Sequence, residues 1–135
     1  MGNECSREMA YALFAEPLLK EVSMLIVSLA LFTIAALVGI FLAKDVFAGK
    51  SPSGLARFTH VGLACVGSVL VIVEVFRGDQ RLWINIGLAV VIIALGGLIW
   101  YLRSKGEFPR KLVLAHGGLA VVCYLVLAYF AFNPR

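Results

Sequence analysis

The chain contains two histidines, and both stand in nearly the same local sequence. His60 lies within LARFTHVGLA (Leu55–Ala64), and His116 lies within KLVLAHGGLA (Lys111–Ala120). Imidazole is a common ligand for metals and for haem iron. Two matched histidines could therefore hold one metal or cofactor from two sides, provided that the fold brings them together.

Four long apolar blocks carry these residues. The chain has 135 residues, of which 61% are hydrophobic and 15% charged, whereas a soluble domain has about 45–50% apolar and about 25% charged residues. Each block is long enough to cross a bilayer, and a lone segment in lipid must be helical to satisfy its backbone. The sequence thus predicts an all-α integral membrane protein with spans at about 22–43, 58–76, 82–102 and 112–132.

The connections between these spans are short, which makes consecutive helices antiparallel neighbours in an up-down-up-down four-helix transmembrane bundle. Before the first span, residues 1–21 interleave apolar and charged side chains. That pattern predicts a short N-terminal helix lying in the membrane interface.

The bundle is predicted to be a tandem repeat of a two-helix unit, with units at 22–77 and 78–135. ALVGIF (Ala36–Phe41) aligns with ALGGLI (Ala94–Ile99), and HVGLA aligns with HGGLA at the two histidines. This alignment pairs Gly39 with the Gly96–Gly97 segment, where glycine indicates close helix packing. Because each unit has an even number of spans, the units share one orientation and are related by an axis along the membrane normal.

That symmetry places His60 and His116 at similar depth on the second and fourth helices, which are diagonal in a four-helix ring. The diagonal axes are expected to be roughly 11–14 Å apart. We predict that this gap is too wide for the imidazoles to touch and suits a flat group between them. Residues four and seven positions after each histidine share its helix face. These positions are small and predict a slot beside the rings: Ala64, Gly67, Ala120 and Cys123.

The residue set predicts one b-type haem, with His60 and His116 as its axial metal ligands. Haem propionates need cations or water, and basic residues lie within about two turns of the histidines. The candidates are Arg57, Arg110 and Lys111. The predicted activity is one-electron transfer, as an electron-transfer component or a membrane oxidoreductase.

Other interpretations of the same residues stay open. The small residues could serve helix packing alone, which would make the chain a structural subunit of a membrane complex. A proton-coupled or small-solute transporter could use Glu74, on the same helix face as His60, with Thr33 and Ser68 between them. Glu74 could equally be a rim carboxylate beside Arg77 and Arg81.

Two further classes of site are not favoured by the sequence. A zinc or copper site would need ligands within about 2–2.3 Å of the ion, but Cys123 is roughly 10 Å along the helix from His116. The sequence has no nucleophilic Ser/His/Asp or Cys/His cluster and no nucleic-acid-binding motif.

Charge sets the expected orientation. Segments 44–57 and 103–111 carry a net positive charge, whereas 1–21 is net negative and 74–81 is neutral. Lysine and arginine are enriched in cytoplasmic loops. We therefore expect the two basic loops inside the cell and both termini outside.

The four-span layout and the motifs THVGLA and AHGGLA resemble those of small bacterial four-helix b-type membrane cytochromes, such as the cytochrome b561-like proteins. That resemblance implies haem b, a bacterial inner membrane location, and electron exchange with a quinol, superoxide or a redox partner protein. The b561-like pattern has two haems, but this sequence has no second histidine on any span. The resemblance therefore implies one haem near the cytoplasmic side, held within one chain or at the interface of a homodimer.

Overall fold

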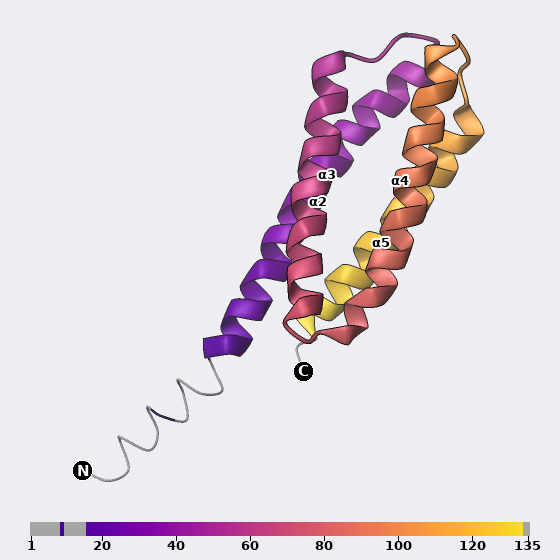
Figure 1. The fold of residues 1–135 in the computed structure, drawn as a ribbon. Coiled ribbons are helices and arrows are strands. Elements are labelled where there is room, and N and C mark those ends of the chain that lie inside the picture. The colour runs from indigo at the N-terminus through magenta and orange to yellow at the C-terminus, as the bar shows by residue number, and fades with distance from the viewer. Residues whose placement is uncertain (1–8, 10–15, 134–135) are drawn as a thin grey trace.

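The computed structural model describes Met9 and residues 16–133, and it confirms the predicted fold class. The main elements in that part of the chain are helical: α2 (Glu16–Phe47), α3 (Gly54–Phe76), the 3₁₀ turn η2 (Gln80–Leu82), α4 (Trp83–Ser104) and α5 (Arg110–Phe132). Four helices are long and apolar enough to cross a membrane, in agreement with the predicted spans. The chain is therefore an integral membrane four-helix bundle (Figure 1).

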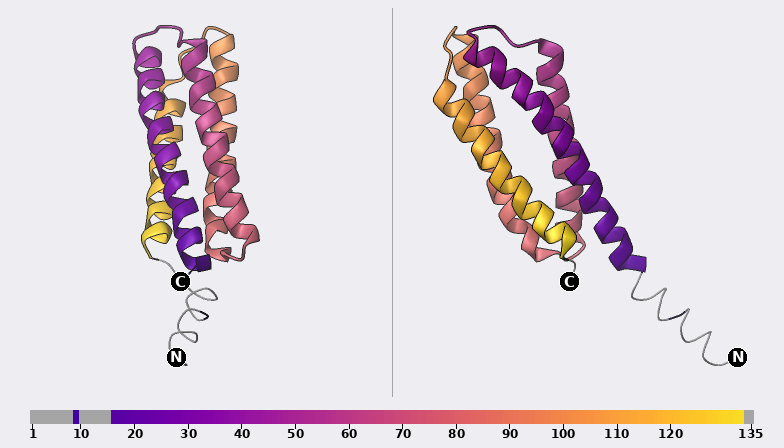
Figure 2. Two further views of the ribbon diagram at one scale, coloured as in Figure 1. Left: turned by 90° about the vertical axis from the view of Figure 1, so that its left-hand side faces the viewer. Right: turned by 180° about the vertical axis from the view of Figure 1, so that it is seen from behind.

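The helices form the expected antiparallel ring. α2 packs most extensively against α3, α4 packs against α5, and α2 also contacts α5, whereas α3 and α4 make few contacts. Among the described residues, the backbones of α3 and α5 do not approach each other closely. Both basic loops lie at one end, here called the basic end, and the turn between α3 and α4 lies at the other, the turn end (Figures 1 and 2).

The helices extend beyond the uncharged blocks that predicted them. α2 continues through Lys44 and Asp45 to Phe47, and α5 begins at Arg110. Charged side chains are compatible with the last turns of a spanning helix because they reach the polar interface. At the other end, residues 16–21 already belong to α2 and not to a separate interfacial helix. The rest of that predicted segment, 1–15, lies outside the described residues except for Met9.

Local signals explain where the helices begin and end. The Ser53 hydroxyl accepts a hydrogen bond from the Ala56 amide and caps α3, a typical role for serine. Pro109 precedes the first residue of α5, where a missing N–H costs nothing. Gly49 and Gly106 have φ of 68° and 83° in the two basic loops, and this left-handed conformation favours glycine.

The packed core is confined to the half of the bundle near the turn end. Its buried side chains come from the N-terminal part of α2, the C-terminal parts of α3 and α5, and the turn: Leu25, Leu29, Val71, Val75, Leu82, Leu127 and Ala131. Outside this cluster, the buried hydrophobic side chains of the described residues are Ala35 and Val46, both on α2. The half toward the basic end is therefore much less filled by its own side chains.

Ion pairs close the turn end. Asp79 is fully buried and pairs with Arg81 at 2.8 Å, and it also accepts the Arg81 amide. Arg81 in turn donates to the Asn133 carbonyl and stacks on the Phe130 ring. The turn that joins the two repeat units is thereby attached to the end of α5.

We predict that Asp79→Ala lowers the free energy of unfolding by about 2–4 kcal/mol, because the fully buried carboxylate loses its charge-assisted bonds to the partly exposed Arg81 guanidinium and its bond from the Arg81 amide. Unfolding in mixed micelles, followed by circular dichroism, measures the change. Glu107→Ala is the control, because Glu107 is an exposed acidic residue at the basic end, and we expect a change within about 0.5 kcal/mol. Equal stability of the two variants would contradict the assignment.

Candidate functional site

The two histidines face each other inside the bundle. His60 on α3 and His116 on α5 each lie six residues after the first residue of their helix. Their ring centroids are 6.2 Å apart, with an angle of 53° between the ring planes. Both side chains extend from diagonal helices toward the centre, so the two rings lie opposite each other across the middle of the bundle.

Each imidazole is held by the preceding helix of its own repeat unit. His60 Nδ1 lies 2.8 Å from the Ala35 carbonyl oxygen, and His116 Nδ1 lies 3.0 Å from the Ile92 carbonyl oxygen. A carbonyl oxygen only accepts, so Nδ1 carries the proton and donates it in both rings. Neither Nε2 has a hydrogen-bond partner among the described residues. Both rings are therefore oriented in the same way relative to the preceding helix, and Nε2 of each ring is available as an electron-pair donor.

Glycines make these contacts possible. In an α-helix the carbonyl of residue i lies beside residue i+4, and the residues four positions after Ala35 and Ile92 are Gly39 and Gly96. A Cβ on Gly39 would lie 3.1 Å from His60 Cε1, and one on Gly96 would lie 3.3 Å from His116 Cε1. Glycine thus leaves the carbonyl uncovered and gives the ring room to reach it.

The structural equivalence of Gly39 and Gly96 corrects the sequence alignment of the two units by one residue. The alignment pairs Gly39 with Gly97, but a Cβ on Gly97 would meet nothing within 4 Å. Gly96 is the residue that contacts a histidine. One residue rotates a helix face by about 100°, so the choice decides whether glycine faces the ring or the outside.

Other side chains pack against two of the four small residues that were predicted to line a slot, Gly67 and Cys123. The Phe32 ring fills the space at Gly67, where an added Cβ would lie 3.0 Å from Phe32 Cζ. Cys123 contacts Asn85, whose Nδ2 donates to the Cys123 carbonyl at 2.9 Å. Asn85 thus links α4 to α5. The expected slot is thus closed at the level of Gly67 and Cys123.

Between the level of Gly67 and Cys123 and the basic end, the bundle has fewer buried side chains. Ala64 and Ala120, one turn from the histidines, are half-buried. Among the described residues of α3, α4 and α5, every buried one lies on the turn-end side of Ala64, Leu88 and Ala120. The region between the level of Gly67 and Cys123 and the basic end therefore has small side chains at the centre and no packed core.

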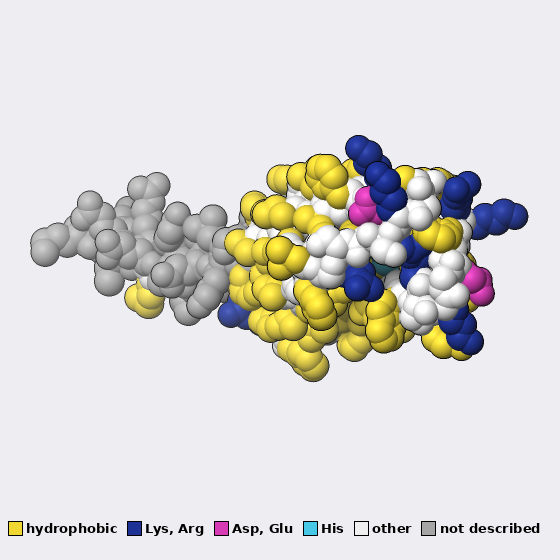
Figure 3. All heavy atoms as spheres, turned by 90° about the horizontal axis from the view of Figure 1, so that it is seen from above, with side chains coloured by type: hydrophobic (Ala, Val, Ile, Leu, Met, Phe, Trp, Pro, Cys, Tyr) yellow, Lys and Arg dark blue, Asp and Glu magenta, His cyan; other side chains and the backbone are white. Residues whose placement is uncertain are grey.

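The three predicted propionate-binding cations have different surroundings. Arg57 lines a pocket at the basic end. Arg110 donates to the Phe47 carbonyl at 3.1 Å, which ties the start of α5 to the end of α2. Lys111 is exposed. Seen from above the basic end, a histidine side chain is visible between surrounding lysine and arginine side chains (Figure 3).

No family model, curated protein or solved structure matches this chain. Within Met9 and residues 16–133, no three His, Cys, Asp or Glu side chains gather as a metal-binding group.

Two features of this site were not predicted from the sequence: the carbonyls that hold the imidazoles and the pocket at the basic end. The carbonyls of Ala35 and Ile92 have no sequence signal of their own, although a glycine at matched positions before each histidine could have indicated them. Trp100 and Arg103, one and two turns beyond Gly96, line the pocket with Arg57. Arg103 was predicted only as part of a basic loop.

We predict that Gly39→Ala displaces the His60 ring and weakens its bond to Ala35, because the added methyl lies within van der Waals contact of the imidazole. Overpacking of this kind costs about 1–3 kcal/mol. Gly97→Ala is the matched control: its methyl meets open space, and alanine is the better helix former. We expect Gly39→Ala to be less stable than Gly97→Ala by about 1 kcal/mol or more.

Unfolding in mixed micelles measures this difference, and ¹⁵N NMR of the imidazole nitrogens reports the Nδ1 bond directly. An unchanged His60 Nδ1 signal in Gly39→Ala, together with equal stability of the two variants, would contradict the proposed contact.

Proposed function

We propose that this chain is a membrane-embedded b-type haem protein in which His60 and His116 are the two axial ligands of one haem. The observation that carries the proposal is the geometry of the pair: two imidazoles from diagonal helices, 6.2 Å apart, each with Nδ1 on a helix carbonyl. The resemblance to four-helix b-type cytochromes points to the same function and stays a prediction.

The separation of the rings suits a shared metal. An imidazole nitrogen coordinates a metal at about 2.0–2.1 Å, so two imidazoles on opposite sides of one ion have centroids about 6.4 Å apart. The 6.2 Å between His60 and His116 is close to this value. Because the porphyrin nitrogens provide the other ligands, a haem needs only these two residues from the protein.

The hydrogen bonds prepare both histidines for this role. A bond from Nδ1–H to a carbonyl fixes the tautomer and the ring orientation, and it raises the basicity of Nε2. Gly39 and Gly96 hold the rings in place through close packing. Haem b, when bound, supplies a reversible one-electron couple, whose potential depends on ligation, hydrogen bonding and burial.

The uneven packing of the bundle also supports a bound group. Protein interiors are normally packed as densely as organic crystals. Here the turn end has such a core, whereas the histidine level has small, half-buried side chains such as Ala64 and Ala120. Phe32 and Asn85 separate the two regions and would limit how far water and cofactor reach toward the turn end.

The pair lies closer to the basic end, which suggests where electrons are exchanged. By the charge bias of loops this end faces the cytoplasm of a bacterial cell and both termini face outward. One haem at this depth serves exchange on one side of the membrane, with a quinol in the bilayer, superoxide or a redox protein as partner. Pairing within one chain needs no homodimer, because both ligands already face each other.

The transport alternative has less support from the contacts. Glu74 is buried and paired with Arg77 at 3.1 Å, as expected for a rim carboxylate, whereas Arg81 pairs with Asp79. Thr33 donates to the Leu29 carbonyl or shares a hydrogen bond with the Tyr124 hydroxyl. These partners give the polar groups structural roles, and they do not suggest a polar route from Glu74 to His60.

We predict that the chain, purified from haem-replete cells and reduced with dithionite, shows a sharp Soret band with resolved α and β bands. His60→Ala and His116→Ala should each lose this low-spin spectrum, because one axial nitrogen is removed. Cys65→Ala is the control: it lies on the same helix as His60 but is exposed, and its spectrum should match that of the original chain.

Added imidazole should restore part of the low-spin spectrum in His60→Ala, which separates loss of a ligand from loss of the fold. A colourless protein that stays colourless after haemin is added would contradict the proposal. So would bands that persist unchanged in both histidine variants.

The orientation is tested separately. We predict that a cysteine introduced at Ser51, in the basic loop, reacts with a membrane-impermeant maleimide only after spheroplasts are lysed, whereas one at Gln80 reacts in intact spheroplasts. Both substitutions are made in a chain whose native cysteines are replaced by alanine: Cys5, Cys65 and Cys123. The reverse labelling pattern would place the basic end outside.

A further inference from the structure

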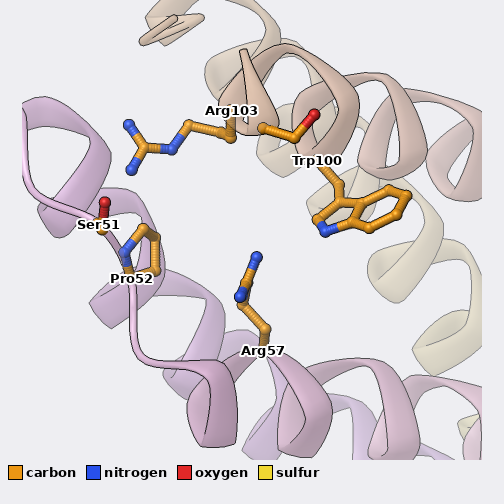
Figure 4. A pocket seen from close by; sticks show the side chains of 6 residues that line it. Ser51, Pro52, Arg57, Trp100 and Arg103 are labelled. Carbon is orange, nitrogen blue, oxygen red and sulfur yellow. The ribbon is translucent and has the colours of Figure 1, made fainter. Parts of the chain in front are cut away.

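A small polar pocket lies between α3 and α4 at the basic end. It has a volume of about 120 Å³. Its lining residues come from the first basic loop and from the facing ends of the two helices (Figure 4): Ser51, Pro52, Arg57, Trp100, Arg103 and Ser104. Whole organic ligands occupy pockets of roughly 300–1,000 Å³, so this pocket fits only the end group of such a ligand.

The pocket concentrates positive charge without a counter-charge. Arg57 extends from α3 toward the α4 residues Trp100 and Arg103 (Figure 4), and no acidic residue lines the pocket. The ion pairs found among the described residues, Glu74–Arg77 and Asp79–Arg81, both lie at the opposite end of the bundle. Two guanidinium groups in one pocket repel each other unless an anion lies between them.

Arg103 has hydrogen-bonding capacity that the described residues do not use. Its Nη2 donates to the Lys50 carbonyl at 2.7 Å, and its guanidinium stacks on the Phe108 ring at 4.1 Å. These two contacts fix the side chain. Its Nε and Nη1 are buried and have no hydrogen-bond partner among the described residues. Leaving a buried charged donor unpaired is costly, and a carboxylate or phosphate oxygen is the acceptor that a guanidinium N–H binds most strongly.

The pocket lies directly beyond the histidine pair. Arg57 is one turn, about 4.5 Å of helix rise, before His60, and Trp100 is about 6 Å of rise beyond Gly96, which contacts His116. A ligand held between the histidines would therefore have its edge at the pocket, and the end group there would be anionic.

We infer that this pocket receives a propionate carboxylate of the haem, with Arg57 and Arg103 as the groups that bind it. This inference rests on the proposed function and deepens it. It assigns to Arg103, on α4, the role that the sequence gave to the cations of α5. Arg110 is engaged with the Phe47 carbonyl and does not line the pocket.

The test compares haemin with haemin dimethyl ester, whose propionates carry no charge. Both are titrated into the haem-free chain in detergent micelles, with the Soret band as the readout. We expect the chain to favour haemin over the ester, and Arg57→Gln/Arg103→Gln to reduce that preference about 10- to 100-fold, since charge-assisted bonds are lost. The ratio between chains cancels the partition of each compound into micelles.

Arg110→Gln is the matched control and should keep the preference of the original chain. If both compounds bind with a Soret band but the double glutamine variant keeps the same preference, the pocket does not bind a propionate and this inference is overturned, while the histidine ligation stands. An anionic phospholipid retained by the haem-loaded original chain but not by the variant in native mass spectrometry would also overturn it, because a lipid phosphate would then occupy the pocket. If neither compound gives a Soret band with the original chain, the proposed function fails.

Discussion

Inside a bilayer an imidazole has no water to bond with, and its hydrogen-bond partners must come from the protein. Both histidines of this bundle find that partner at a helical carbonyl that a glycine leaves uncovered: Ala35 beside Gly39, and Ile92 beside Gly96. A carbonyl oxygen has two lone pairs and can accept a second bond while staying in its helix. This contact joins the two helices of each unit, fixes the tautomer, and directs the remaining nitrogen away from that carbonyl.

The rest of the architecture is consistent with this constraint. Because the unit is present twice in one orientation, the same carbonyl contact is available to both histidines. The four-helix ring then brings the two side chains to the centre from diagonal helices. Stability is concentrated elsewhere, in the apolar core and the ion pairs of the turn end. The less densely packed half toward the basic end contains the histidine pair, and Arg57 and Arg103 line a pocket beyond it.

Much of the architecture could be predicted because it depends on the composition of long segments and on their repetition along the chain. The spans follow from apolar length, the ring follows from short loops, and the matched depth of His60 and His116 follows from the repeat. Helix ends were less predictable, since Lys44 and Asp45 can extend beyond the hydrocarbon while remaining helical.

The finer features of the site depend on contacts that a sequence does not encode locally. Gly97 matches Gly39 in the alignment, yet Gly96 faces the ring, because a one-residue shift is invisible to sequence identity but turns the helix face. The Phe32 ring occupies the space beside Gly67, and this contact depends on how α2 crosses α3. In sequence, Arg103 is one of several basic residues between the third and fourth spans. In the described part of the chain, its position in the last turn of α4 and its unpaired buried nitrogens distinguish it.

The proposed function requires that the two histidines of a single chain hold one haem. Native mass spectrometry of the protein, released from nanodiscs after purification from haem-replete cells, counts the chains and haems in each complex. We expect a monomer carrying one non-covalently bound haem b, and haem-free monomers for His60→Ala and His116→Ala. A chain that carries no haem, or a haem found only in dimers at one per two chains, would contradict it.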